Sequence, residues 1–245
     1  MAMSLSPTVL HPLTLPGLLD HILTTQTEDN ARTLLVVCSS REAFLADLRE
    51  ALQQHDEQEE HRKSTLHDLL TPTLFNLLAT QHIQLAFCPS VQSLLAYLTA
   101  HGRRSTEARQ AAPGTERLVL VNPLALHAPT TSFSAQGLSR TFAAATEAAL
   151  HAGATLYIVE CQGKQRRADD GEDDEDGEAE RVGVDEPDDG TEAEPGDPWD
   201  QQVSILNLSA RRYRSGSSDR AWAGRTVTAR RVAARWCHFR NVDVE

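Results

Sequence analysis

Polar residues follow apolar runs at two places in the chain, and their types raise the question of metal-dependent chemistry. Asn122 follows the run 118–121, and Glu160 follows the run 155–159. A Mg²⁺-dependent NTPase commonly places an aspartate after such a strand. Asn122 offers Mg²⁺ an oxygen but no charge. The turn CSSREAF, which follows an apolar run ending at Cys38, lacks the glycines and the lysine of a phosphate-binding loop. The sequence therefore predicts a non-catalytic protein without a cofactor.

Other side chains that could do chemistry have simpler explanations. Glu160 could act as a general base, but a strand-end carboxylate in water is the favoured interpretation. The four cysteines (Cys38, Cys88, Cys161 and Cys237) form no CxxC pair, so buried thiols are favoured over a zinc site. The triplet 137–139 resembles part of a nucleophile elbow but lacks its second glycine, so Ser139 is expected on a helix.

The elements that would position these residues alternate along the chain. Short apolar runs predict strands buried on both faces at 33–38, 83–88, 117–122 and 155–161. Apolar residues at helical spacing predict helices at 13–24, 40–52, 66–79, 90–100 and 134–151. After them, 202–209 and 225–239 are interpreted as antiparallel edge strands. The pattern predicts an α/β fold with a doubly wound, mainly parallel sheet, whose ligands would meet the carboxyl ends of the strands.

The net charge of −12 hides two opposite regions. Residues 169–200 hold 17 Asp and Glu against one basic residue, so the rest of the chain carries +4. This acidic stretch has few apolar residues, which predicts a disordered loop at 165–198 within one domain, 1–245. Residues 201–245 hold nine arginines against three acids. No apolar run can cross a bilayer and no signal peptide is evident, so a soluble intracellular protein is expected.

Several of these motifs together resemble a known family. The stretch VNPLALHAPTTSFSAQGLSRTF, an Ala/Leu helix and TLYIVEC resemble the second half of a recombinase paralogue of the RecA superfamily. Trp199 ahead of a strand and basic residues is similar to the family's tail. The lost phosphate loop and Asn122 match its degenerate branch, the Csm-type Shu-complex subunits. The resemblance spans roughly 30–165 and 199–240, and it implies a RecA-like fold.

The resemblance also implies a function. Such subunits have lost nucleotide chemistry, pair with another RecA-like subunit, bind single-stranded or fork DNA, and promote recombinase filament assembly in the nucleus. The DNA-contacting loop of the family corresponds here to Lys164, Arg166 and Arg167. These residues could equally be a solvated surface cluster or a nuclear-localisation signal. An alternative within the superfamily is an architectural subunit of an Elongator-type assembly that acts on tRNA.

The arginine-rich tail supports two interpretations of its own. Arg211, Arg212 and Arg214 surround a tyrosine, and this combination suits contact with nucleic acid. Four further arginines (Arg230, Arg231, Arg235 and Arg240) could face DNA or an acidic partner surface. Trp222 and Trp236 are expected in a core or an interface, where a partner subunit would cover them.

Overall fold

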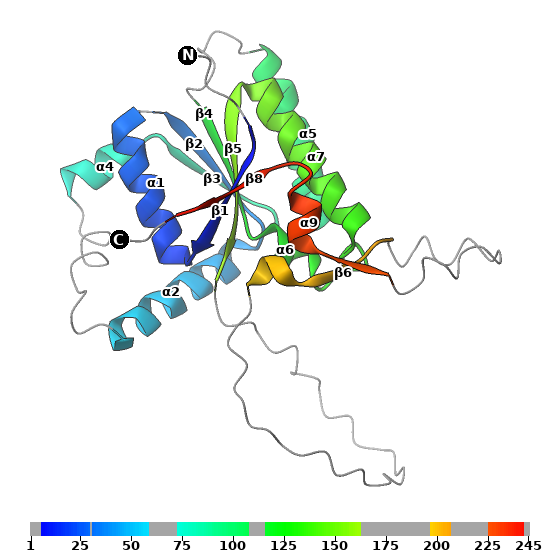
Figure 1. The fold of residues 1–245 in the computed structure, drawn as a ribbon. Coiled ribbons are helices and arrows are strands. Elements are labelled where there is room, and N and C mark those ends of the chain that lie inside the picture. Colours follow the sequence, from blue (N-terminus) through cyan, green and yellow to red (C-terminus); the bar gives the residue numbers. More distant parts are fainter. Residues whose placement is uncertain are drawn as a thin grey trace, which may run out of the picture.

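A computed structural model describes residues 6–29, 31–58, 73–107, 116–162, 197–206 and 225–242, and it shows an α/β protein built on one large sheet (Figure 1). Six strands lie side by side in the order β3-β2-β4-β5-β1-β8, and every neighbouring pair is parallel. The strands are β1 (Thr8–Leu13), β2 (Arg32–Val37), β3 (Ile83–Phe87), β4 (Glu116–Val121), β5 (Ala154–Cys161) and β8 (His238–Asn241). The prediction of a mainly parallel α/β sheet is confirmed.

Helices cover both faces of this sheet. They are α1 (Leu15–Asp29), α2 (Arg41–Gln58), α4 (Leu74–Thr80), α5 (Val91–Glu107), α6 (Pro123–His127), α7 (Ala135–Ala152) and α9 (Ala229–Ala233), with a 3-10 turn η1 (Pro198–Asp200). On one face, α1 and α2 pack against the sheet through residues such as Leu18 and Phe44. On the other, α5 and α7 pack through Leu94, Leu138 and Phe142. None of the helices that the structure describes is long and apolar enough to span a membrane.

The middle strands follow from their composition. Apolar residues 118–121 in β4 occupy consecutive positions, so they point alternately to both faces, and all four are buried. The helix after β4 was predicted at 134–151, and α7 agrees closely with it. Ser134 caps α7 by accepting a hydrogen bond from the Gly137 backbone N–H, and Gly153 ends it in the left-handed conformation.

The N-terminal strand β1 was not predicted. It lies between β5 and β8, and Val9, Leu10 and Leu13 are buried there. His11 and Pro12 interrupt the apolar run in TVLHPL, which weakens its strand signal. The run ending at Val37 is consequently the second strand of the chain, and the predicted helix at 13–24 begins after β1, at Leu15.

The C-terminal strands differ from the prediction. β8 is an edge strand that pairs parallel to β1, so the expectation of antiparallel edge strands in this sheet was wrong. Antiparallel pairing is found between β6 (Gln202–Ser204) and β7 (Thr226–Thr228), which form a separate two-stranded sheet. The stretch 225–239 is not one strand, because Thr228 accepts a hydrogen bond from the Arg231 backbone N–H and starts α9.

Candidate functional site at the carboxyl end of the sheet

Four residues form a row across the carboxyl end of the sheet. Four residues are aligned across neighbouring strands: Phe87 of β3, Val37 of β2, Val121 of β4 and Val159 of β5. The next residue of each strand therefore lies level with its neighbours, in the order Cys88, Cys38, Asn122 and Glu160. Backbone N–H groups of the first three continue the ladder by donating to carbonyl oxygens of the adjacent strand at 2.8–2.9 Å. We call these four residues the strand-end row. In a doubly wound sheet this is where a ligand is expected.

Asn122, the row's amide, is engaged inside the protein. Its Oδ1 accepts a hydrogen bond from the Cys161 backbone N–H at 2.8 Å. Its backbone is left-handed (φ 57°, ψ 47°), a conformation that asparagine tolerates better than most residues. Pro123 follows as the first residue of α6, where its missing N–H costs nothing. Asn122 thus turns the chain from β4 into α6, and its side-chain oxygen is already occupied.

Glu160, the row's carboxylate, holds the start of α6. Its Oε2 accepts from the Leu124 backbone N–H at 2.8 Å and its Oε1 from the Ala125 backbone N–H at 2.9 Å. Asn122 makes no side-chain cap of its own helix, so Glu160 satisfies N–H groups that would otherwise lack an acceptor. Only 5% of Glu160 is exposed, so the interpretation as a carboxylate in water was wrong.

The environment of Glu160 also changes its acidity. Burial raises the pKa of this carboxyl to about 7, and the two backbone hydrogen bonds oppose that rise because they favour the charged form. A carboxyl near pKa 7 suits proton transfer, but both oxygens are turned into the protein. The geometry supports a structural role for Glu160.

The thiols around the row are unsuited to nucleophilic chemistry. Cys38 and Cys88 are buried, and burial raises the pKa of each; the Glu160 charge raises that of Cys38 further. The pKa of Cys161 is raised for the same two reasons, and burial raises that of Cys237 to about 12. Such thiols stay protonated and unreactive at neutral pH. Among the described residues, no three His, Cys, Asp or Glu side chains gather where they could hold a metal ion.

The junction between β1 and α1 leaves little room for a phosphate loop. A single residue, Thr14, joins Leu13 to Leu15. Its hydroxyl accepts from the Gly17 backbone N–H at 3.2 Å and its carbonyl from that of Leu18 at 2.9 Å. A phosphate loop needs several residues between strand and helix to wrap its ligand. The turn expected to hold a phosphate loop was the one after Val37, because β1 was not recognised from the sequence. Neither the turn after Val37 nor the junction at Thr14 carries such a loop.

The predicted DNA-binding residues (Lys164, Arg166, Arg167, Arg211, Arg212 and Arg214) lie outside the described part of the chain, as does Trp222. Of the predicted acidic loop, only Asp197 and Pro198 are described. The structure shows where the two segments that carry these residues join the fold. Gln162 donates its N–H to the Leu13 carbonyl at the end of β1, and Ser204 forms a bridge with Ser134 at the start of α7. The end of β5 and strand β6, which precede these segments in the sequence, therefore lie near the carboxyl end of the sheet (Figure 1).

The arginines of the described tail divide into two groups. Arg230 is internal: its Nε donates to Asp200 Oδ1 at 3.2 Å, its Nη2 to Asp197 Oδ2, and its guanidinium lies 4.8 Å from the centre of the Phe239 ring. Arg231, Arg235 and Arg240 are exposed. Arg230 thus connects η1 and β8 to α9. Its aspartate partners lie far from it in the sequence, so this role could not be predicted from the sequence.

The tryptophans divide in the same way. Trp199 is fully buried, with its ring centroid 5.4 Å from that of Phe239 and 6.5 Å from that of Phe142. Trp236 follows α9 and is 36% exposed. Ser139 lies within α7, as expected.

No protein-family model matches this sequence, and no curated protein matches it either.

Proposed function

We propose that this protein is a non-catalytic, RecA-like accessory subunit of a nuclear DNA-repair complex. In this role it pairs with another RecA-like subunit, binds single-stranded or fork DNA, and promotes assembly of a recombinase filament. The observation that carries the proposal is the strand-end row. At the positions where a nucleotide-hydrolysing relative would present ligand oxygens, Asn122 and Glu160 accept backbone hydrogen bonds instead.

Three further features support the proposal. The β1–α1 junction is a single residue, so nucleotide phosphates have no loop to bind them. Strand β4, helix α7 and strand β5 follow one another as in the family that the sequence resembles. Two short basic clusters follow closely on described residues near the same end of the sheet: 164–167 comes after Gln162, and 211–214 comes after Leu206. Such clusters favour contact with the phosphates of a nucleic acid.

The pairing part of the proposal has a physical basis in the exposed apolar residues. Leu74, Leu77 and Leu78 of α4 and Leu85 of the edge strand β3 are each more than half exposed. Edge strands and exposed apolar side chains are common features of subunit contacts. By contrast, α1 buries Leu15, Leu18 and Ile22 against the sheet.

A tagged copy of the full chain expressed in its own cells would test the proposal. Mass spectrometry of the purified complex should identify a RecA-like partner, and the complex should prefer fork or single-stranded DNA to tRNA in a competition titration. Added to its recombinase, the complex should shorten the delay before filaments form. A preference for tRNA would instead support the architectural, Elongator-type alternative. A chain that recovers no RecA-like partner and binds no DNA would refute the proposal.

A further inference from the structure

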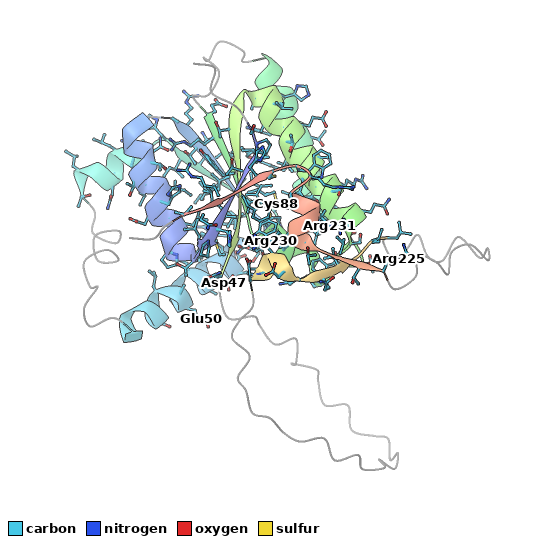
Figure 2. The ribbon with its side chains drawn as sticks, viewed as in Figure 1. Asp47, Glu50, Cys88, Arg225, Arg230 and Arg231 are labelled. Carbon is cyan, nitrogen blue, oxygen red and sulfur yellow. The ribbon has the colours of Figure 1, made fainter. Side chains whose placement is uncertain are left out.

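The C-terminal part of the fold is strongly basic. Residues 225–242 contain five arginines and no acidic residue. The opposite face of the sheet carries acidic side chains such as Asp47 and Glu50 on α2, and Figure 2 shows them far from Arg225 and Arg231. Because α2 also carries Arg41 and Arg49, its charge is mixed, and the one-sided charge is that of residues 225–242, which is independent of the acidic stretch at 169–200.

The way α9 is packed decides which of these arginines are available. Ala229, Val232 and Ala233 are buried, and α9 packs against α7 through this face. Arg230 is held by Asp197, Asp200 and Phe239. Arg231 and Arg235 are exposed and form no ion pair with any other described residue. Burial lowers the pKa of His21 on α1, and the nearby charge of Arg240 lowers it further, so Arg240 lies on the α1 side of the sheet.

An exposed tryptophan accompanies these two arginines. Trp236 follows Arg235 directly, and its backbone N–H donates to the Ala233 carbonyl at 2.8 Å, which fixes the turn after α9. The indole is 36% exposed and stacks on no ring of the described residues. A partly exposed aromatic ring next in sequence to one unpaired arginine, with a second arginine about one turn earlier, is a combination that suits single-stranded nucleic acid, because bases stack on the ring while the cations meet phosphates.

We propose that Arg231, Arg235 and Trp236 form a contact for single-stranded DNA, in which the two guanidinium groups bind consecutive phosphates and the indole stacks on one base. This contact rests on the proposed function and names the surface through which the fold itself would touch DNA. A duplex offers no free base face to the indole, so stacking selects the single strand. An acidic protein segment would use the arginines but leave the indole without a matching partner.

The chain around α9 favours the same ligand. Ile205 donates its backbone N–H to the Arg225 carbonyl at 3.2 Å, so residues 207–224 leave and rejoin the fold at the β6–β7 pair, which leads directly into α9. Within 207–224 the sequence repeats the combination of arginines and an aromatic residue at 211–214. The proposed contact itself consists of the three described residues only.

A binding titration at several salt concentrations tests this contact. The full chain, with its partner where one co-purifies, is added to a fluorescently labelled dT20 oligonucleotide. The double variant Arg231→Ala/Arg235→Ala should bind about tenfold more weakly at low salt. Its salt slope should be less steep by about 1.4, since each phosphate contact on a single strand contributes about 0.7. Trp236→Ala should lose about 5- to 100-fold in affinity with an unchanged salt slope, and Trp236→Phe should retain most of the affinity.

Matched controls separate this surface from charge in general. Arg32→Ala/Arg49→Ala removes two exposed arginines from β2 and α2 and should bind dT20 as the wild type does. The Trp236→Ala loss should disappear on a duplex of the same length. Thermal unfolding of the arginine variant should match the wild type, because Arg231 and Arg235 are exposed. Trp236 is only 36% exposed, so the binding of Trp236→Ala is measured at a temperature where its unfolding curve shows the variant to be folded.

Different failures point to different conclusions. If the wild type binds dT20 and both the arginine and tryptophan variants bind equally well, this contact is wrong while the proposed function stands. The arginine variant could lose affinity for poly-L-glutamate as strongly as for dT20, while Trp236→Ala changes neither affinity. In that case the surface binds acidic protein, and the proposed DNA contact is wrong. If the wild type binds no nucleic acid at all, the contact and the proposed function fall together.

Discussion

The strand-end row and the region of α9 both carry polar side chains, but those of the row point into the protein and two arginines of the α9 region point into solvent. In the row, Asn122 and Glu160 direct their oxygens inward to backbone N–H groups at 2.8–2.9 Å. In α9 and the turn that follows it, the exposed Arg231 and Arg235 direct their charges outward. The row occupies the place where such folds bind ligands, yet its groups stabilise the protein. A residue's position in the fold therefore does not give its role until its hydrogen bonds are known.

The same contrast holds between two neighbours in α9. Arg230 lies against Phe239 and two aspartates, whereas Arg231 is exposed. They are adjacent in sequence and identical in type, and only helical geometry separates them, since successive residues point about 100° apart. Substitutions at the strand-end row and at these two arginines therefore test whether inward-directed groups stabilise the fold and outward-directed ones do not.

The largest effect is expected at Glu160. Glu160→Ala removes the acceptor of the Leu124 and Ala125 N–H groups, and a buried unsatisfied group costs about 1–3 kcal/mol. The free energy of unfolding should fall by about 3 kcal/mol in denaturant titrations. Glu147→Ala, at an exposed carboxylate on α7, is the matched control and should change it by less than about 0.5 kcal/mol. Equal values for the two variants would show that Glu160 does not hold α6.

A second effect concerns pH. The folded-state pKa of Glu160, about 7, lies above its ordinary value of 4.5, so the folded protein binds this proton more tightly than the unfolded chain. Its contribution to stability is therefore complete below pH 4.5 and is lost as pH rises through 7, by on the order of 2–3 kcal/mol. Burial lowers the pKa of His127, which makes an opposite contribution, so wild type and Glu160→Gln must be compared at each pH. The two curves should diverge between pH 4.5 and 7.5; parallel curves would place the Glu160 pKa near its ordinary value.

A smaller effect is expected at Arg230. Arg230→Ala removes two ion pairs and the contact with the Phe239 ring, and this side chain is 35% exposed. The free energy of unfolding should fall by about 1–2 kcal/mol. Arg231→Ala should leave it within about 0.5 kcal/mol. If Arg231→Ala destabilised the protein as much as Arg230→Ala, the division between internal and exposed arginines would be wrong.

The smallest effect is expected from nucleotide. Millimolar Mg-ATP should leave the melting temperature of the wild type and of Asn122→Asp unchanged, because Asn122 is engaged with Cys161 and the β1–α1 junction has no phosphate loop. A ligand at 100 times its Kd would add about 2.7 kcal/mol. A clear ATP-dependent rise in the wild type would refute the non-catalytic interpretation. A rise in Asn122→Asp alone would mean that the charge at this position was the missing element.

Much of the central fold could be predicted from local sequence. The runs at β2, β4 and β5 are continuous and apolar, and Ser134 signals the start of α7 three residues before its buried face begins at Gly137. These signals are local because burial on both faces and capping each depend on a few consecutive residues.

The rest depends on contacts between distant segments. β1 could not be recognised because its burial comes from β5 and β8, and its own sequence contains His11 and Pro12. The parallel direction of β8 follows from its pairing with β1, which no local pattern encodes. Glu160 could be noticed as a strand-end carboxylate, but its role depends on α6 folding back over β5.

The position of β1 in the sheet has a consequence for synthesis. Among the described strands it is made earliest, yet its two neighbours lie about 150 and 230 residues further along, which makes their pairing slow. Until β8 emerges, the backbone edge of β1 that β8 will cover stays open, a site where a nascent chain can pair wrongly or recruit a chaperone. Among the described strands, the one made latest therefore closes the sheet by covering the one made earliest.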